Sequence, residues 1–167
     1  ILGPVSLQLA HLGSLITYIA AVTILVASLI ALTQDSMKRR LAYSTIGQLA
    51  YMVLGAGMLS ATGMLGGVMH LAMHAFGKIT LFFCAGAIYV ASKKKNISQM
   101  NGLGKRMPIT YLAFFLGSLS IIGMPPLGGF ISKWNMLIGA VEGEQLVLIV
   151  VLLVSSLLNA AYFFPIV

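Results

Sequence analysis

A row of ionisable side chains lies in the middle of an apolar stretch, where such groups are rare. His70, His74 and Lys78 follow one another at intervals of four residues, within a stretch that runs from about residue 64 to 91. On an α-helix each interval turns the chain by only about 40°, so the three side chains project from one face. Imidazole titrates near neutral pH, and an ammonium group carries a transferable proton. The row therefore predicts groups that pass protons to one another through bridging water.

A second lysine, Lys133, lies in another apolar stretch, from about residue 109 to 141. One straight helix of that length would be about 50 Å long, although a hydrocarbon core is only about 30 Å thick. Pro125, Pro126 and three glycines interrupt the stretch between residues 123 and 129. Because proline removes backbone donors and glycine loosens the backbone, we predict a broken helix, with the break near 124–129. Broken helices in membranes are typical of transport sites.

Other interpretations of these residues stay open. The histidines could form hydrogen bonds with neighbouring helices, and Lys133 could extend to the membrane surface beside a packing kink. His70 and His74 could share a metal ion, but no third Cys, Asp or Glu ligand is near them in the sequence. A haem would need opposed histidines, and the third histidine, His11, lies near a predicted helix end. We therefore predict no metal and no cofactor, and a proton relay formed by Lys78, Lys133, His70 and His74.

The composition indicates lipid as the surrounding solvent. Apolar residues make up 59% of the 167 residues, charged residues make up 8%, and the mean hydropathy is +1.02. Soluble domains average about 45–50% apolar and about 25% charged residues. These values exclude a disordered chain and argue against an ordinary soluble globule. We predict an all-α fold and a polytopic membrane protein with a single transmembrane domain (1–167). This domain would contain about five transmembrane helices, at about 7–32, 41–59, 64–91, 109–141 and 145–164.

Basic residues are concentrated in two connections between the predicted helices. Eight of the ten Lys and Arg residues lie in the loops around 33–40 and 92–108, and two predicted crossings separate these loops. The other connections, around 60–63 and 142–144, carry no Lys or Arg. Since cytoplasmic loops are rich in Lys and Arg, we predict that both basic loops face the cytoplasm from the cell inner membrane. A net charge of +7 would suggest nucleic acid as the partner of a soluble protein, but here it is explained by topology.

Several chemistries lack the residues they need in this sequence. The single cysteine, Cys84, cannot form an intramolecular disulfide or bind an iron–sulfur cluster by itself. The sequence has no phosphate-binding glycine loop and no catalytic triad pattern. We therefore predict no redox site in this chain, so any redox chemistry would take place in partner subunits.

Three motifs together resemble the signatures of one family. They are residues 35–51 (DSMKRRLAYSTIGQLAY), 70–78 (HLAMHAFGK) and 124–133 (MPPLGGFISK). In this order they resemble the antiporter-like membrane subunits, which include the proton-channel subunits of respiratory complex I, membrane-bound hydrogenase subunits and subunits of the Mrp-type Na+/H+ antiporters. Two shorter runs, 104–108 (GKRMP) and 132–134 (SKW), are more similar to the Mrp-type D subunit than to complex I.

The resemblance implies a fold and a function. In that family two inverted five-helix repeats each contain a broken helix and half of a proton path, and this chain would be the second repeat of a longer subunit. It implies that Lys78, His70 and His74 are relay groups on the central axis, and that Lys133 exchanges protons with the outer side. The implied function is proton translocation in a multisubunit monovalent cation/proton antiporter, with other membrane subunits as partners in the lipid bilayer and with H+ and Na+ as the ions.

Two alternatives stand beside the antiporter. One is a proton-pumping membrane-arm subunit of NADH-quinone oxidoreductase (complex I) or of a membrane-bound hydrogenase, in which redox reactions in partner subunits drive the pump. The sequence does not separate this function from the antiporter, because the family is shared. The other alternative is a structural or haem-binding membrane anchor, whose function would be indifferent to the loss of either buried lysine.

Overall fold

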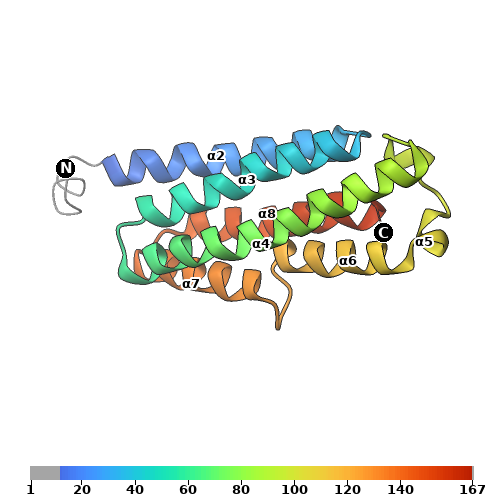
Figure 1. Cartoon of the computed structure of the whole chain (residues 1–167). Helices are drawn as coiled ribbons and strands as arrows, with labels where there is room; N and C mark the ends of the chain where they lie inside the picture. Colours follow the sequence, from blue (N-terminus) through green and yellow to red (C-terminus); the bar gives the residue numbers. More distant parts are fainter. Residues whose placement is uncertain (1–11, 167) are drawn as a thin grey trace.

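The chain folds as a bundle of helices that run roughly along one long axis (Figure 1). The computed structural model describes residues 12–166, so the predicted helix start at residue 7 and His11 lie outside the described residues. The long helices are α2 (Leu12–Thr33), α3 (Met37–Gly57), α4 (Ala61–Ser92), α6 (Pro108–Ile122), α7 (Gly128–Glu142) and α8 (Leu146–Phe163). The short ones are η1 (Ile97–Gln99), α5 (Leu103–Arg106) and η2 (Phe164–Ile166). Residues 12–166 contain no β-strand, which confirms the predicted all-α fold class.

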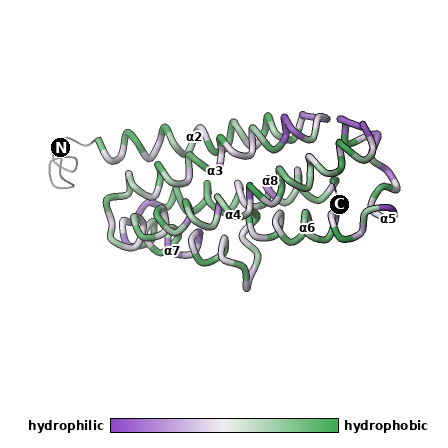
Figure 2. The backbone as a smooth tube through the Cα atoms, in the orientation of Figure 1, coloured by the Kyte–Doolittle hydropathy of each residue, from purple (hydrophilic) through white to green (hydrophobic). Residues whose placement is uncertain are grey.

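The bundle is apolar on the outside and carries polar groups inside. Phe83 and Ile109 are 75% and 82% exposed, whereas His70 and Lys78 are only 2% and 5% exposed. By length and composition α2, α4 and the segment Leu146–Ile166 could each cross a membrane, and α6 is a shorter apolar helix. Hydrophobic residues cover much of the length of the helices, and hydrophilic residues gather most densely at one end (Figure 2). These features confirm the prediction of a polytopic membrane protein.

The proline-broken helix is confirmed as two half-helices, α6 and α7, joined by residues 123–127. Gly123 ends α6 with a φ of +90°, a left-handed conformation that glycine adopts without steric cost. Pro125 and Pro126 follow in the connection. In a continuous helix their N–H groups would bond to the carbonyls of Ile121 and Ile122, but proline has no N–H. The break therefore leaves carbonyl oxygens near the middle of the bundle that need other donors.

Glycines bring α4 and α7 into direct backbone contact. α4 packs against α3, α6 and α7, so it lies at the centre of the bundle. A Cβ atom at Gly139 of α7 would lie 2.6 Å from the backbone nitrogen of Gly63 on α4. A Cβ atom at Gly66 would lie 2.7 Å from the backbone nitrogen of Met136. Small residues permit such close approach of membrane helices, and here they hold α7 against the histidine face of α4.

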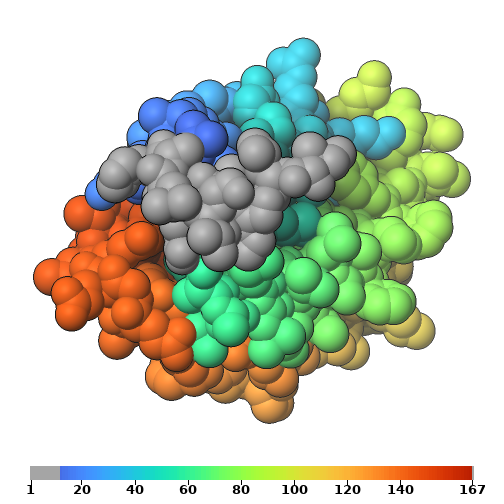
Figure 3. Space-filling model, turned by 90° about the vertical axis from the view of Figure 1, so that its left-hand side faces the viewer, coloured from blue at the N-terminus to red at the C-terminus, as the bar shows by residue number. Residues whose placement is uncertain are grey.

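The two basic connections lie at the same end of the bundle (Figure 1), and backbone hydrogen bonds join them. Met37 N donates to Lys95 O (3.2 Å), and Ile97 N donates to Asp35 O (2.8 Å). At the opposite end the α3–α4 and α7–α8 turns lie side by side (Figure 3). The alternation of basic and non-basic connections in the sequence therefore corresponds to the two ends of the bundle.

α3 begins at Met37, four residues before the helix start predicted at 41. The prediction placed the start at the first apolar residue, but the helix continues past that point and includes three basic residues that were expected in the connection. Two of them are exposed, whereas Arg40 is buried. The Arg40 guanidinium donates to backbone carbonyls at the ends of α2 and α8, among them Tyr162 O (3.0 Å). Such carbonyls lack helical partners, so Arg40 joins two helix ends to α3.

The α4–α7 contact predicts the effect of adding one methyl group. We expect Gly139→Ala to lower the free energy of unfolding by about 1–3 kcal/mol, because the new Cβ would meet backbone atoms that cannot move aside cheaply. Gly86→Ala is the matched control, since a Cβ there meets nothing within 4 Å, and it should be neutral or raise stability by up to about 1 kcal/mol. Thermal unfolding in detergent, followed by circular dichroism, measures both. Equal melting temperatures for the two variants would contradict the close contact.

Candidate functional site

Lys78 lies in the interior of the bundle on α4. Its Nζ donates to Leu41 O (3.0 Å) and to Ser44 Oγ (2.8 Å), both on α3. The ring centroid of Phe163 lies 5.6 Å from Nζ, within the range of a cation–π contact. A neutral carbonyl, a hydroxyl and an aromatic ring thus surround the ammonium group.

Lys133 lies on α7 beside the helix break and is also buried. Its Nζ donates to Ile122 O (2.9 Å) and to Ser156 Oγ (3.3 Å), and it lies 4.9 Å from the ring centroid of Tyr51. Ile122 O is available because the residue four positions later, Pro126, has no N–H. The break therefore supplies the acceptor that holds this lysine, and the negative end of the α6 dipole also faces it.

A cavity of about 200 Å³ opens beside Lys133, between α7 and α8. Gly123, Trp134 and Ser156 are among the residues that line it. Trp134 is half exposed, so the cavity lies near the outer face of the bundle. The Lys133 side chain thus connects the interior of the bundle with an opening on its side.

The two histidines of the row are buried on the same face of α4 as Lys78. His70 Nδ1 lies 2.9 Å from Ser132 Oγ on α7, and His70 Nε2 lies 2.9 Å from Gln48 Oε1 on α3. The ring of His74 stacks on that of His70 with centroids 6.1 Å apart. His74 Nδ1 is buried and has no hydrogen-bond partner in the described part of the chain. His70 therefore connects the residue next to Lys133 with α3, and His74 lies between His70 and Lys78 along α4.

The Ser132 hydroxyl has one proton and two acceptors within reach. It lies 3.0 Å from Gly129 O and 2.9 Å from His70 Nδ1. When His70 carries a proton only on Nε2, which donates to Gln48 Oε1, Ser132 can donate to Nδ1. When His70 carries protons on both ring nitrogens, Nδ1 donates to Ser132, whose own proton turns to Gly129 O. A rotation of this hydroxyl thus accommodates both protonation states of the imidazole.

Sequence reasoning missed most of the polar residues around the two lysines. Six of them are buried at spacings of four and then three residues along two helices: Ser44, Gln48 and Tyr51 on α3, and Ser155, Asn159 and Tyr162 on α8. This spacing places each set of three on one helix face. Polar residues at helical spacing inside an apolar stretch are therefore the signal that could have identified them.

These residues form hydrogen bonds between α3 and α8. The Tyr162 hydroxyl lies 2.9 Å from Ser44 Oγ and 2.6 Å from Asn159 Oδ1. Because Asn159 Oδ1 can only accept, it takes the single Tyr162 proton, and Ser44 Oγ accepts from Lys78 Nζ while its own proton can go to the tyrosine oxygen. The Tyr51 hydroxyl lies 2.5 Å from Ser155 Oγ. The result is two hydrogen-bonded groups in the interior: one contacts Lys78 through Ser44, and in the other the Tyr51 ring contacts Lys133.

No carboxylate neutralises either lysine within the described residues. The three acidic residues of the sequence, Asp35, Glu142 and Glu144, are all exposed in or beside the connections at the two ends of the bundle. The ammonium charges are instead stabilised by carbonyl, hydroxyl and aromatic groups. An ionisable group at membrane depth costs at least about 2.5–3.5 kcal/mol, and such groups are typical of ion and proton pathways.

The fold and these groups define a class of protein, a polytopic helical membrane protein with two buried lysines beside a broken helix. The family described as NADH:quinone oxidoreductase/Mrp antiporter, transmembrane, matches residues 4–159. The chain belongs to this family, as the three sequence motifs predict.

Individual relatives agree with this family. NADH-quinone oxidoreductase subunit N of Desulforudis audaxviator is 41% identical over 165 residues, which cover 99% of this chain and 32% of the relative. The Mrp complex of Dietzia sp. contains a chain with a TM-score of 0.89 at 28% identity, covering 92% of this chain and 29% of that one. A chain of respiratory complex I of Thermus thermophilus has a TM-score of 0.88 at 25% identity, and the match covers 94% of this chain and 33% of that one. The chain thus spans about a third of the length of these proteins.

The contact between Ser44 and Lys78 predicts an energetic coupling. We expect Ser44→Ala to lower the free energy of unfolding by about 1–3 kcal/mol in the wild type, because a buried ammonium group loses an acceptor. The same substitution should cost at least about 1 kcal/mol less in a Lys78→Met background. Thermal unfolding of the four proteins in detergent measures this double-mutant cycle.

Thr45→Val provides the control for this cycle. The Thr45 hydroxyl donates only within its own helix, to Leu41 O (2.9 Å), so its loss should have nearly the same cost in both backgrounds. If Ser44→Ala lowers the free energy of unfolding equally in the two backgrounds, the serine does not stabilise the ammonium group.

Proposed function

We propose that this chain moves protons across the membrane, through a relay of Lys78, Lys133, His70 and His74, as part of a multisubunit monovalent cation/proton antiporter. One observation carries the proposal: within the described residues both lysines are buried without a carboxylate partner and are held by uncharged polar groups. A purely structural lysine would be stabilised better by a carboxylate or by exposure to water. The lysines instead keep contacts that hold either a charged or a neutral amine.

The relay has two parts with different structures. Beside Lys133 the side chains of Ser132, His70 and Gln48 are joined by hydrogen bonds across to α3, whereas Lys133 Nζ itself contacts Ile122 O and Ser156 Oγ. Between His70 and Lys78 it passes His74, whose buried Nδ1 has no partner in the described chain. Buried polar groups of this kind are commonly satisfied by ordered water, which also conducts protons. We therefore place water beside His74 as the bridge to Lys78.

Charge repulsion provides the driving force for the transfer. Two unit charges in a protein interior repel one another more strongly than in water, because the effective dielectric constant is lower. A proton that arrives at one lysine therefore favours proton release at the other. Lys133 would release its proton to the cavity between α7 and α8, which its side chain lines.

The chain would act as one transmembrane unit, the second five-helix repeat, of a longer subunit. It spans about a third of the length of its relatives, and similar structures belong to multisubunit membrane complexes. We propose that its partners are other membrane subunits, with H+ and Na+ as the transported ions. We propose the cell inner membrane as its location, and the positive-inside rule supports an orientation with the loops around 33–40 and 92–108 in the cytoplasm.

A second candidate function is a proton-pumping subunit of NADH-quinone oxidoreductase or a related redox-driven complex. The 41% identity to subunit N over 99% of the chain favours it. Redox centres would then lie in partner subunits. The two functions differ in what drives the protons, and the purified complex distinguishes them. A Na+-dependent pH change in vesicles without an electron donor supports the antiporter, whereas quinone reduction coupled to acidification supports the redox-driven pump.

The relay predicts the effect of removing either lysine. We expect Lys78→Ala and Lys133→Ala, each made in the full-length subunit within its complex, to abolish most proton-coupled activity in inverted membrane vesicles. Lys105→Ala is the control, because Lys105 is a basic residue of the short helix α5, outside the interior, and its loss should leave transport unchanged. A pH-sensitive dye reports proton movement. Transport at the wild-type rate in both interior variants would refute the relay.

A further inference from the structure

Three lysine side chains converge on one tyrosine ring at the basic end of the bundle. The Nζ atoms of Lys38, Lys93 and Lys95 lie 5.1, 5.9 and 5.7 Å from the ring centroid of Tyr89. Within residues 12–166 no carboxylate lies within 4.0 Å of these nitrogens. Like charges gathered in this way repel one another, and a cation–π contact offsets only part of that cost.

The nearest acidic residue along the chain is engaged elsewhere. Asp35 Oδ1 accepts from Ser98 N (3.1 Å), and Asp35 Oδ2 accepts from Ser98 Oγ (2.8 Å). These hydrogen bonds from Ser98 hold the pKa of the Asp35 carboxyl below its usual value. The Asp35 carboxylate therefore joins the two basic connections to each other and leaves the lysines around Tyr89 without a counterion.

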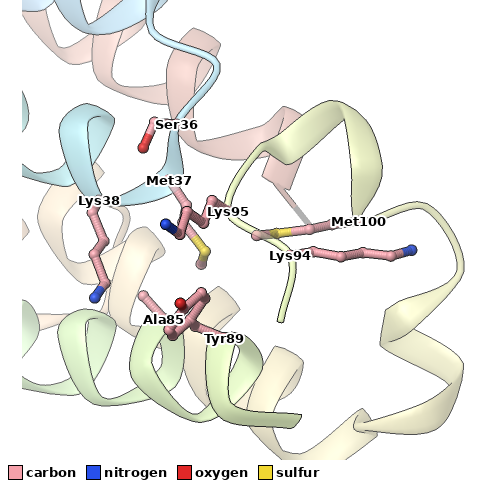
Figure 4. Close-up of a pocket in the computed structure, with 8 residues that line it drawn as sticks. All are labelled: Ser36, Met37, Lys38, Ala85, Tyr89, Lys94, Lys95 and Met100. Carbon is pink, nitrogen blue, oxygen red and sulfur yellow. The ribbon is translucent and has the colours of Figure 1, made fainter. Parts of the chain in front are cut away.

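Lys38, Lys95 and Tyr89 line a cavity of about 270 Å³. Figure 4 shows Lys38 and Lys95 on opposite sides of it, Tyr89 at its base, and the Lys94 ammonium group directed away. Ser36 and three apolar side chains, Met37, Ala85 and Met100, form the rest of the wall. The cavity thus combines positive charge with an apolar surface.

We propose that this cavity binds the phosphate headgroup of an anionic phospholipid, with the phosphate between Lys38 and Lys95 and the acyl chains along the outer face of α4. The cavity lies where α3 begins and α4 ends, at the boundary between membrane-spanning helices and their connections. Basic pockets between transmembrane helices at this depth are suited to anionic headgroups.

The surface below the cavity favours a lipid over a free anion. Phe82 lies seven residues before Tyr89, on the same face of α4, and is 41% exposed. Phe83 and Val90, on the neighbouring face, are 75% and 68% exposed. An acyl chain beneath the headgroup would contact this apolar surface, whereas inorganic phosphate could use only the lysines. A zwitterionic lipid would bring its own cation next to the lysines and bind less well.

Lipid retention by the purified protein tests the proposal. The full-length protein that contains this chain is equilibrated in detergent with equal amounts of phosphatidylglycerol and phosphatidylcholine, and native mass spectrometry measures the lipid that it retains. The wild type should retain phosphatidylglycerol preferentially. Lys38→Gln with Lys95→Gln should reduce its retention roughly fivefold per lysine, or about 25-fold together. The control pair, Lys105→Gln with Arg106→Gln, removes the same charge at the same end outside the cavity and should retain the lipid.

Each contrary result identifies what is wrong with the proposal. Equal loss in the control pair would mean that diffuse surface charge, and no defined cavity, attracts the lipid. Displacement of phosphatidylglycerol by excess inorganic phosphate would assign the cavity to a free anion. Equal retention of both lipids by the wild type would also overturn the proposal. The counterion of the lysines would then be an acidic group of a protein partner. Tyr89→Leu keeps all charges and should still weaken retention, because it removes the ring around which the ammonium groups are arranged.

Discussion

The structure depends on one constraint, which is that an ammonium group inside a bilayer must be given polar contacts by the protein itself. Lys78 and Lys133 meet this constraint in two ways. For Lys78 a neighbouring intact helix provides a carbonyl and a hydroxyl. For Lys133 the acceptor comes from a helix that ends early, because Pro126 cannot donate to Ile122 O. The break is therefore a part of the site as well as a feature of the fold.

The same constraint explains why the interior is built from hydroxyls, amides and imidazoles. A carboxylate beside either lysine would fix a permanent ion pair, and a proton could then leave only against that attraction. Ser44 and Ser156 can hold an amine in either protonation state, and Ser132 can serve both states of His70 by rotation. The close glycine contact of α4 with α7 keeps these short side chains within reach of one another.

The sequence predicted the fold class and the broken helix because both follow from local composition. Long apolar stretches with few charges are typical of membrane helices, and two adjacent prolines interrupt such a helix. It also singled out the four residues of the proposed relay, since ionisable groups inside an apolar stretch are visible without a structure. The partners were not predictable in the same way. Ser44 and Tyr162 are 118 positions apart and meet only after the helices have packed. Arg40 is buried although its two basic neighbours are exposed, because two helix ends happen to converge on it.

High-resolution cryo-electron microscopy of the full-length protein in a lipid nanodisc can show whether water connects the buried groups, because it locates ordered water in the interior. The proposed relay predicts density for water beside His74 Nδ1, as the first of a row of hydrogen-bonded waters that reaches Lys78, with both lysine Nζ atoms inside the bundle. Apolar side chains packed tightly between His74 and Lys78, or either ammonium group turned towards the lipid headgroups, would contradict it.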